Sequence, residues 1–532
     1  MISVETLNKA IELTKKGNIK EAEALYLELL SNEPKNYIIL SALGLFYINR
    51  KDFNNASKYL KKACEINKTF GNLSALGFVE YEQENYKESA KILEQSLKYG
   101  ENSDIYNKLI LSFFHIKDYE NAIKYSAIMH QKYPKDINAI SNMIKSLTQS
   151  GKLLEAEKLC IQHLKENQNS ASLWFHLGLL KEVIYCDDKL ACECYKMALE
   201  LGSKESYHNI AVSYQKQKKY GKAEEYYKKM LEYNPNSIET KTSLGMFYLS
   251  QKKFKEGYEL FFQRNNQTLK DFNHNFWQPN LKIDKEVVVI GDQGFGDHIQ
   301  FIRYLPFLEK NVEKFTIATR NSLIKLFENN YPEYKFIKYD EINPCTQAIR
   351  ITDLAYALNI DFNNIPFSEG YLKSTQKEII SNKLKVGLCW EAGNNGLRTM
   401  LNKSINIKLL EPFFNLKNVQ IYSFQVNDSL NGNSKYPEMI NLSKDFKDFE
   451  DTAQSLLAMD IVISVDTSVV HLAGALGVKT FLMLPYYSDW RWFNDTKTTP
   501  WYNSVEIFKQ TDPISWEKPI EEIICRLKEY SS

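Results

Sequence analysis

The feature that most constrains this chain is a spacing of about 34 residues between small residues in its first half. Each small residue stands in a stretch whose apolar residues recur at helical spacing. They are Ala22, Ala56, Ala90, Ala122, Ala156, Ala191, Ala223 and Gly257. A fixed period of this length predicts stacked helix pairs, because one pair alone cannot bury its apolar face.

Other positions keep the same period. A Leu-Gly pair recurs in the first helix of a unit, at Leu43-Gly44, Leu76-Gly77, Leu177-Gly178 and Leu244-Gly245. An aromatic residue precedes the small residue at Phe53, Tyr86, Tyr119, Tyr220 and Phe254. With these companions, residues 1–264 resemble about eight tetratricopeptide repeats. That resemblance implies an N-terminal α-solenoid that presents a surface to peptide or protein.

Asparagines in the first helices are candidate contacts to a bound protein. In some peptide-binding relatives, asparagines at a fixed first-helix position form a ladder along the ligand backbone. Counting back fourteen residues from each small residue gives Asn8, Asn142 and Asn209, with other residue types in the remaining units. We take Asn142 and Asn209 as candidate acceptor-binding residues.

Composition narrows the classes of partner. The 532 residues predict two or three domains. Lysine plus arginine (67) nearly balances aspartate plus glutamate (66), so bulk charge favours neither nucleic acid nor an anionic membrane. No apolar run approaches about 18 residues, and the start lacks a secretory pattern, so we expect a cytoplasmic protein without a transmembrane segment. Eight scattered cysteines without metal-ligand spacing fit free thiols and predict no metal site.

The second half predicts a different architecture. From Glu286 onward, short β-branched strands alternate with helical stretches, which is typical of parallel α/β units. The polar stretch 374–383 divides the region into lobes at 286–378 and 384–532, with a site expected between them. Residues 265–285 carry large aromatic residues, so we expect a packed join. The expected strands are 287–290, 315–318, 334–337, 385–390, 419–424, 461–464 and 480–484.

The first lobe opens with a strand, a glycine turn and a helix. Gly294 and Gly296 let the backbone of this turn approach a phosphate or sugar closely. Asp297 stands at the start of the helix. Its carboxylate is either a charge that complements the helix dipole or a general base that faces a cleft.

The second lobe repeats this plan in residues 458–477. Asp466, Thr467 and Ser468 form an acidic, hydroxyl-rich turn between a strand and a helix. Free N–H groups and hydroxyls at a helix start suit a diphosphate, although the same residue types are also ordinary N-caps. His471 lies one turn into the helix, where it either reaches the same site or is a hydrogen-bonded core histidine.

Two further loops follow strands of the second lobe. The first, 391–404, combines glycines with Arg398, Lys403 and Ser404 and suits phosphate recognition, or is a solvated basic loop. The second, 485–493, places aromatic rings and an arginine after a strand. Its rings either stack on a base or sugar or pack the seam between the lobes.

Three motifs carry a wider resemblance. Residues 291–306, 387–390 and 464–477 resemble bacterial glycosyltransferases of the GT-B fold, nearest to the lipopolysaccharide heptosyltransferase superfamily. Repeats followed by a compact GT-B domain of two Rossmann-like lobes resemble bacterial protein glycosyltransferases, including flagellin glycosyltransferases, and are similar in plan to O-linked N-acetylglucosamine transferases. The resemblance implies inverting transfer of a sugar from a nucleotide-sugar to a protein hydroxyl.

By that resemblance Asp297 is the catalytic base, and Lys403 or Arg398 holds the donor diphosphate. The implied donor site contains Gly294, Gly296, Trp390, Arg398, Lys403, Ser404, Asp466, Thr467, Ser468 and His471. No D-x-D motif follows a strand, so cationic groups rather than a metal are expected to stabilise the leaving group. Two alternatives stay open: a non-catalytic scaffold, and transfer to a glycan or lipid.

Overall fold

The computed structural model describes residues 4–264, 286–343, 347–393, 403–426, 428, 432–493 and 496–531. The chain divides into two compact units, Met1–Ser206 and Tyr207–Ser532. The boundary falls inside the repeats, so the last helix pairs belong to the unit that holds the sheets. Among the described residues, no helix combines the length and the apolar character needed to cross a membrane.

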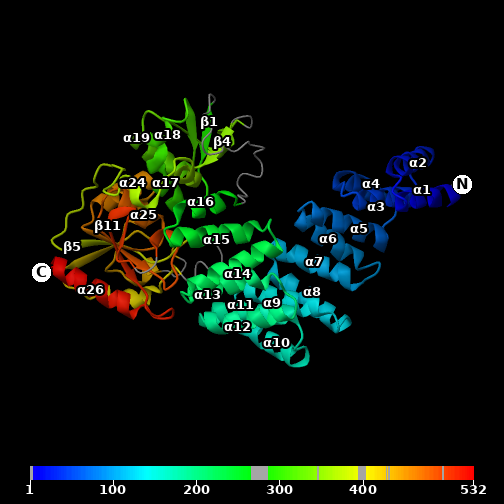
Figure 1. The fold of residues 1–532 in the computed structure, drawn as a ribbon, viewed down its shortest axis with the longest axis horizontal. Helices are drawn as coiled ribbons and strands as arrows, with labels where there is room; N and C mark the ends of the chain where they lie inside the picture. Colours follow the sequence, from blue (N-terminus) through cyan, green and yellow to red (C-terminus); the bar gives the residue numbers. More distant parts are fainter. Residues whose placement is uncertain are drawn as a thin grey trace. The chain divides into compact units, whose positions relative to one another are not determined.

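Consecutive helix pairs make up the first unit (Figure 1). Its helices are α1 (Val4–Lys15), α2 (Ile19–Asn32), α3 (Tyr37–Asn49), α4 (Phe53–Ile66), α5 (Phe70–Glu82), α6 (Tyr86–Ser96), α7 (Ser103–His115), α8 (Tyr119–Lys132), α9 (Ile137–Gln149), α10 (Leu153–Glu166), α11 (Ala171–Tyr185) and α12 (Asp188–Glu200). The second unit begins with α13 (Ser206–Lys216), α14 (Tyr220–Tyr233), α15 (Ile238–Ser250) and α16 (Phe254–Phe262).

Small residues explain how the two helices of a pair approach each other. Ala56 is fully buried, and a Cβ added to Gly44 would lie 2.6 Å from Leu60 Cγ. Likewise, a Cβ on Gly77 would lie 2.5 Å from Leu93 Cδ2. The predicted period is therefore confirmed as a helical solenoid whose regular spacing places the smallest side chains at the helix contacts.

The first sheet has four parallel strands in the order β3-β2-β1-β4. They are β1 (Val287–Ile290), β2 (Phe315–Ala318), β3 (Lys335–Ile337) and β4 (Gln347–Arg350). The sequence predicted the first three strands and missed β4, because its first and last residues, Gln347 and Arg350, are polar. Strand β1 lies between β2 and β4, so the direction of strand succession reverses beside it, and ligands of such sheets bind at that reversal.

The second sheet has the order β10-β11-β9-β8-β5-β6-β7, and only the β10–β11 pair is antiparallel among its described strands. The strands are β5 (Leu384–Cys389), β6 (Val419–Ser423), β7 (Ile440–Asn441), β8 (Ile461–Val465), β9 (Thr480–Leu484), β10 (Thr498–Thr499) and β11 (Tyr502–Lys509). The parallel strands follow the order of a doubly wound sheet. The sequence missed β7, β10 and β11.

Helices follow these strands along the chain. They are α17 (Phe295–Phe301), α18 (Leu305–Leu308), α19 (Asn321–Asn330), α20 (Leu354–Ala357), α22 (Glu411–Phe414), α23 (Gly432–Lys435), α24 (Phe449–Leu457), α25 (Ser468–Ala475) and α26 (Glu517–Ser531). Helix α17 follows β1 and packs on α25, which follows β8 (Figure 1). This contact brings the carboxyl ends of β1 and β8 toward each other.

One apolar core joins α16 to both sheets. It contains Phe254 and Tyr258 of α16, Val289 of the first sheet and Leu482 of the second. The ring of Phe254 stacks on Trp501 with centroids 6.1 Å apart. The last helix pair and the two sheets therefore share a buried interior, which explains why this pair belongs to the same unit as the sheets.

A buried ionic network fixes the end of α16 to the first sheet. Arg264 Nη2 lies 2.7 Å from Asp292 Oδ2, and its Nη1 lies 2.6 Å from Asp353 Oδ1. Thr352 Oγ1 donates to Asp292 Oδ1 at 2.7 Å, and Arg350 Nη1 donates to the Arg264 carbonyl oxygen at 2.8 Å. Burial alone would raise the pKa of Asp292, but Arg264 outweighs it and holds that pKa below its usual value.

Replacing Arg264 with leucine should destabilise the full chain by about 3–5 kcal/mol, because the buried Asp292 loses its cation and the buried Asp353 keeps only Arg350. Urea unfolding followed by tryptophan fluorescence measures the loss. Arg526→Leu is the matched control, since Arg526 contacts Glu506 and Glu529 with a side chain that is 35% exposed. It should cost about 1 kcal/mol or less. Equal losses in the two variants would contradict the assigned role of the network.

Candidate functional site

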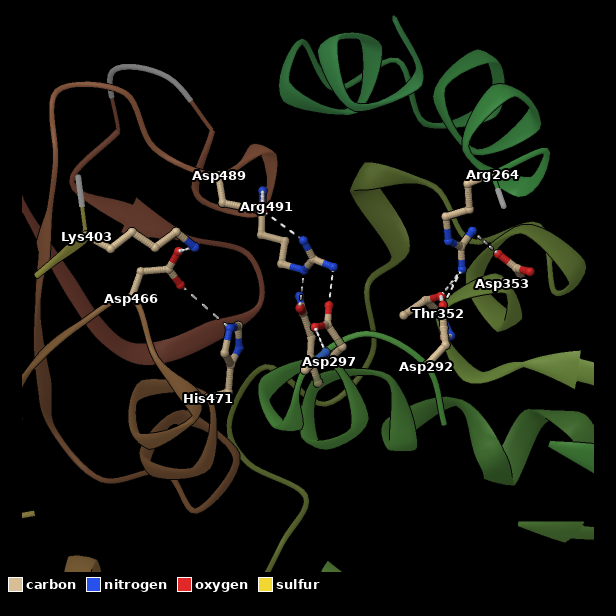
Figure 2. A network of polar contacts seen from close by, with 12 residues as sticks. Arg264, Asp292, Asp297, Thr352, Asp353, Lys403, Asp466, His471, Asp489 and Arg491 are labelled. Atoms are coloured by element: carbon tan, nitrogen blue, oxygen red, sulfur yellow. Dashed lines mark hydrogen bonds and ion pairs between the residues drawn. The ribbon is translucent and has the colours of Figure 1, made fainter. Parts of the chain in front are cut away.

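Asp297 closes the first turn of α17. The Gly294 N–H donates to Asp297 Oδ2 at 2.9 Å, which is the geometry of a carboxylate at a helix start. The other oxygen, Oδ1, forms an ion pair with Arg491 Nη2 (Figure 2). The Asp297 side chain keeps 18% of its surface exposed. The carboxylate thus serves the first of its two predicted roles, and its role as a base stays a prediction.

Arg491 connects α17 to the loop after β9. It lies in the 3-10 helix η8 (Trp490–Trp492). Its Nη1 is 2.8 Å from Asp489 Oδ1, and its Nε donates to Gln300 Oε1 at 3.0 Å. With the pair to Asp297, one guanidinium therefore holds two carboxylates and an amide oxygen, using the forked donors that distinguish arginine from lysine.

Burial and charge act on the carboxylates in opposite directions. Burial raises the pKa of Asp297 above its usual range, and Arg491 and the Gly294 N–H offset only part of that rise. Burial also acts to raise the pKa of Asp489, but Arg491 and then Lys403 outweigh it and lower that pKa to about 2. Asp297 is therefore the more basic of the two carboxylates on Arg491.

A second polar group surrounds the start of α25. Lys403 Nζ lies 2.5 Å from Asp466 Oδ2 (Figure 2). Burial alone would lower the pKa of Lys403, but the Asp466 carboxylate outweighs it and raises that pKa. Both residues come from predicted donor loops, and the structure brings them together.

His471 is buried beside this group. Its Nδ1 lies 3.0 Å from the Tyr502 hydroxyl, and its ring stacks on Trp492 with centroids 5.1 Å apart. Burial lowers the pKa of His471 to about 3, so the ring is neutral near pH 7. Its Nε2 is 4.0 Å from Asp466 Oδ1, too long for a hydrogen bond. His471 thus makes the contacts predicted for a hydrogen-bonded core histidine, and it lies beside Asp466 of the predicted donor site.

Gly296 is what allows α17 to approach His471. A Cβ added at Gly296 would lie 2.6 Å from His471 Cδ2, whereas one at Gly294 would meet only Asp297 Oδ2 at 3.4 Å. Position 296 therefore requires glycine because any larger side chain would clash with the ring of His471. The structure gives no such need at Gly294.

The side chain of Thr467 caps the start of α25. Thr467 Oγ1 accepts from the Val469 N–H at 3.3 Å and lies 3.2 Å from Ser464 Oγ. Ser468 is the first residue of the helix and is half-buried. Of the two predictions for this turn, N-cap and anion site, the structure shows the cap, and the anion site stays a prediction.

The remaining predicted donor residues differ in their surroundings. Ser404 Oγ accepts from the Ala392 N–H at 3.0 Å and so closes its loop. The Trp390 ring is fully buried in the core of the second sheet, which gives it packing partners instead of an open face. Arg398 lies outside the described residues, as does the predicted join at 265–285.

The two candidate acceptor asparagines belong to different units. Asn142 lies on α9 in the first unit, where its Nδ2 donates to Asn107 Oδ1 on α7 at 2.6 Å. Asn209 lies on α13 in the second unit and is half-buried. Their role as acceptor contacts stays a prediction.

Sequence reasoning identified neither Asp489 nor Gln300 as a site residue, and it did not predict that Arg491 pairs with Asp297. It had placed an arginine in the loop after β9, and that loop position was the available signal. Gln300 and Asp489 are separated in sequence by a whole lobe, so only folding brings them to one guanidinium. Among the residues the structure describes, no three histidine, cysteine, aspartate or glutamate side chains converge as a metal site would require.

Similarity to known proteins is clear in the repeats. Residues 39–70 and 205–237 match the tetratricopeptide repeat family. Protein FlbA of Caulobacter vibrioides is 22% identical over 471 residues, covering 78% of this chain and 76% of that protein. The chain therefore contains tetratricopeptide repeats, which are units that bind other proteins.

Two solved structures resemble part of this chain. A tetratricopeptide repeat protein from Parabacteroides merdae is 15% identical, with 49% of this chain and 97% of that chain covered and a TM-score of 0.39. Yeast Tom70 is 18% identical, with 46% of this chain and 54% of that chain covered and a TM-score of 0.37.

Exchanging each glycine for alanine tests the contact between α17 and α25. Gly296→Ala should lower the free energy of unfolding by about 1–2 kcal/mol, because overpacking against His471 exceeds the gain in helix propensity. Gly294→Ala, two positions away, should stay within about 1 kcal/mol of the parent. Thermal unfolding of the full chain compares them, and an unchanged Gly296 variant would refute the close approach.

Proposed function

We propose that this protein is a glycosyltransferase that moves a sugar from a nucleotide-sugar to a hydroxyl group of a protein. The observation that supports this best is the packing of α17 on α25. Each helix begins just after a strand of a parallel sheet, and this edge is where such sheets bind ligands. A partly exposed carboxylate, Asp297, and two cations, Arg491 and Lys403, belong to these surroundings.

These groups match the needs of inverting transfer. The Asp297 carboxylate accepts the proton of the acceptor hydroxyl as that oxygen bonds to the anomeric carbon. The bond from this carbon to the diphosphate oxygen breaks, and the negative charge moves to the diphosphate. Cationic side chains and the N–H groups at the start of α25 stabilise that charge. In this proposal the two sheet-bearing lobes act as a GT-B catalytic region.

The repeats supply the acceptor. Tetratricopeptide repeats bind proteins, so we assign the protein substrate to their surface, with flagellin as one candidate. We place the reaction in the cytoplasm. Among the described cysteines, Cys64, Cys160, Cys194, Cys389 and Cys525 form no disulfide, as a reducing compartment favours.

A scaffold without turnover is the second candidate. Its supporting observation is that Arg491 already neutralises Asp297, as a purely structural ion pair would.

The two candidate functions differ in nucleotide binding, because a scaffold does not need a nucleotide. Titrating the full chain with UDP, GDP, CDP, ADP and dTDP sugars by calorimetry separates them. Binding of one nucleotide class supports the transferase, and no binding across the panel favours the scaffold.

Asp297→Asn should lower turnover by about 10²- to 10⁴-fold, because the amide cannot accept the acceptor proton. The measurement is single-turnover transfer with the nucleotide-sugar that the titration identifies and the protein that the repeats retain. Asp340→Asn makes the same change in charge at an exposed site of the same lobe and should leave the rate unchanged. Full activity in the Asp297 variant would sink the base assignment.

Lys403→Ala should weaken donor binding by about 10- to 100-fold, since the diphosphate loses a charge-assisted contact. Lys408→Ala, an exposed change in the 3-10 helix Ile407–Leu410 that follows this loop, is the control and should bind as the parent does. Calorimetric affinities compare the two variants. If both bind the donor equally well, Lys403 does not contact the diphosphate.

A further inference from the structure

Arg491 occupies a position that conflicts with the proposed reaction. Its guanidinium contacts Asp297, Asp489 and Gln300, and its side chain is only 10% exposed. A general base is weakened by a cation on its carboxylate, because the cation stabilises the ionised form. The ion pair with Arg491 therefore makes Asp297 a weaker base than the same buried carboxylate would be without a cation.

The charges around Asp297 explain what would change this. The charged or titratable groups nearby are Asp292, Arg320 and His298 on the α17 side, and Lys403, Asp466, His471, Asp489 and Arg491 on the α25 side. Asp292 is already paired with Arg264, Arg320 donates to the Gln293 carbonyl oxygen at 2.9 Å, and burial lowers the pKa of His298 to about 4 and of His471 to about 3.

The remaining groups leave an excess of negative charge. The carboxylates of Asp297, Asp466 and Asp489 face the cations Lys403 and Arg491. Each cation is thus engaged by a carboxylate of this chain. A diphosphate entering here must draw a cation away from its partner, because unpaired anions in a site of low dielectric repel strongly.

Arg491 is the cation better suited to this exchange. Its planar fork can hold two phosphate oxygens at once, which lysine cannot. It also contacts two carboxylates, so after turning away from Asp297 it can keep Asp489. Asp297 in turn keeps the Gly294 N–H, so the carboxylate retains a donor when the guanidinium leaves.

We propose that Arg491 is a ligand of the donor diphosphate, and that diphosphate binding draws its guanidinium away from Asp297 and frees the base. This inference rests on the proposed function and adds a regulation to it. The Asp297–Arg491 pair holds the base inactive until a donor is bound. Deprotonation of the acceptor then follows donor binding, which fixes the order of the two substrates.

Two consequences can be measured without any acceptor. When Arg491 leaves, Asp297 loses its counter-ion and gains a neighbouring anion, so its pKa rises on binding. The complex then takes up a proton at mildly acidic pH, and diphosphate affinity increases as the pH falls. Well above the raised pKa the carboxylate stays ionised, so uptake disappears while its strength as a base is greater.

Asp297→Asn removes the competitor for Arg491. It should bind a diphosphate about tenfold more tightly than the parent at pH about 7.5, because no ion pair has to break. Its affinity should also lose the part of the pH dependence that the Asp297 carboxyl contributes, so that only the titration of the diphosphate itself remains. Asp340→Asn, with the same loss of charge at an exposed site of the same lobe, should match the parent in both respects.

The experiment is calorimetric titration of the full chain with UDP, GDP, CDP, ADP, dTDP and inorganic pyrophosphate between about pH 5.5 and about pH 8. Each titration is repeated in two buffers of different ionisation enthalpy, which gives the number of protons taken up. The parent, Asp297→Asn, Asp340→Asn and Arg491→Lys are compared, with thermal unfolding as a check that each variant is folded. Arg491→Lys should bind more weakly because the fork is lost.

Greater proton uptake by the parent than by Asp297→Asn, together with tighter binding by that variant, supports the exchange. Binding by both without uptake and with equal affinity overturns it while leaving the transferase proposal intact. Uptake with nucleotides but not with pyrophosphate overturns the assignment of Arg491 to the diphosphate. Silence of the parent with binding by Asp297→Asn overturns the exchange, because the diphosphate then does not displace Arg491 from Asp297, whereas silence of both overturns the transferase proposal and this inference together.

Discussion

The close contact between α17 and α25 is the constraint on which the rest of the site depends. It exists because Gly296 has no Cβ, and His471 Cδ2 fills that space. Both helices begin at carboxyl ends of parallel strands, so their contact sets the strand ends of two separate sheets side by side. The ion pair between Asp297 and Arg491 spans the same junction, because it joins α17 of the first lobe to the loop after β9 of the second.

The two sheets share a plan but differ at the edge where such sheets bind ligands. In the first sheet the space beside β1 and β4 is taken by Arg264, whose guanidinium pairs with Asp292 and Asp353. Arg264 therefore occupies this edge of the first sheet and attaches the end of α16 to it. At the second sheet, Lys403 and the half-buried start of α25 come from loops after β5 and β8. The same topology thus serves attachment in one lobe and, in our proposal, binding in the other.

Much of the fold could be read from local pattern. The 34-residue period gave every helix pair, because small residues such as Ala56 must lie where two helices touch. Strands such as Val287–Ile290 are continuous β-branched runs and were equally legible. Strand β4 and the long β11 were missed, since Gln347–Arg350 and Tyr502–Lys509 mix polar and apolar residues and lack the continuous β-branched run of β1.

The sequence by itself determined that this chain has tetratricopeptide repeats and parallel sheets, and it located Asp297, Lys403 and Asp466 after strands. Those properties depend on neighbours within a few residues or on a fixed period. Only the tertiary structure decided that Lys403 pairs with Asp466 and that Arg491 holds Asp297. The reason is that charge pairing depends on distance in space, and a separation of 194 residues along the chain carries no information about which carboxylate a guanidinium will meet.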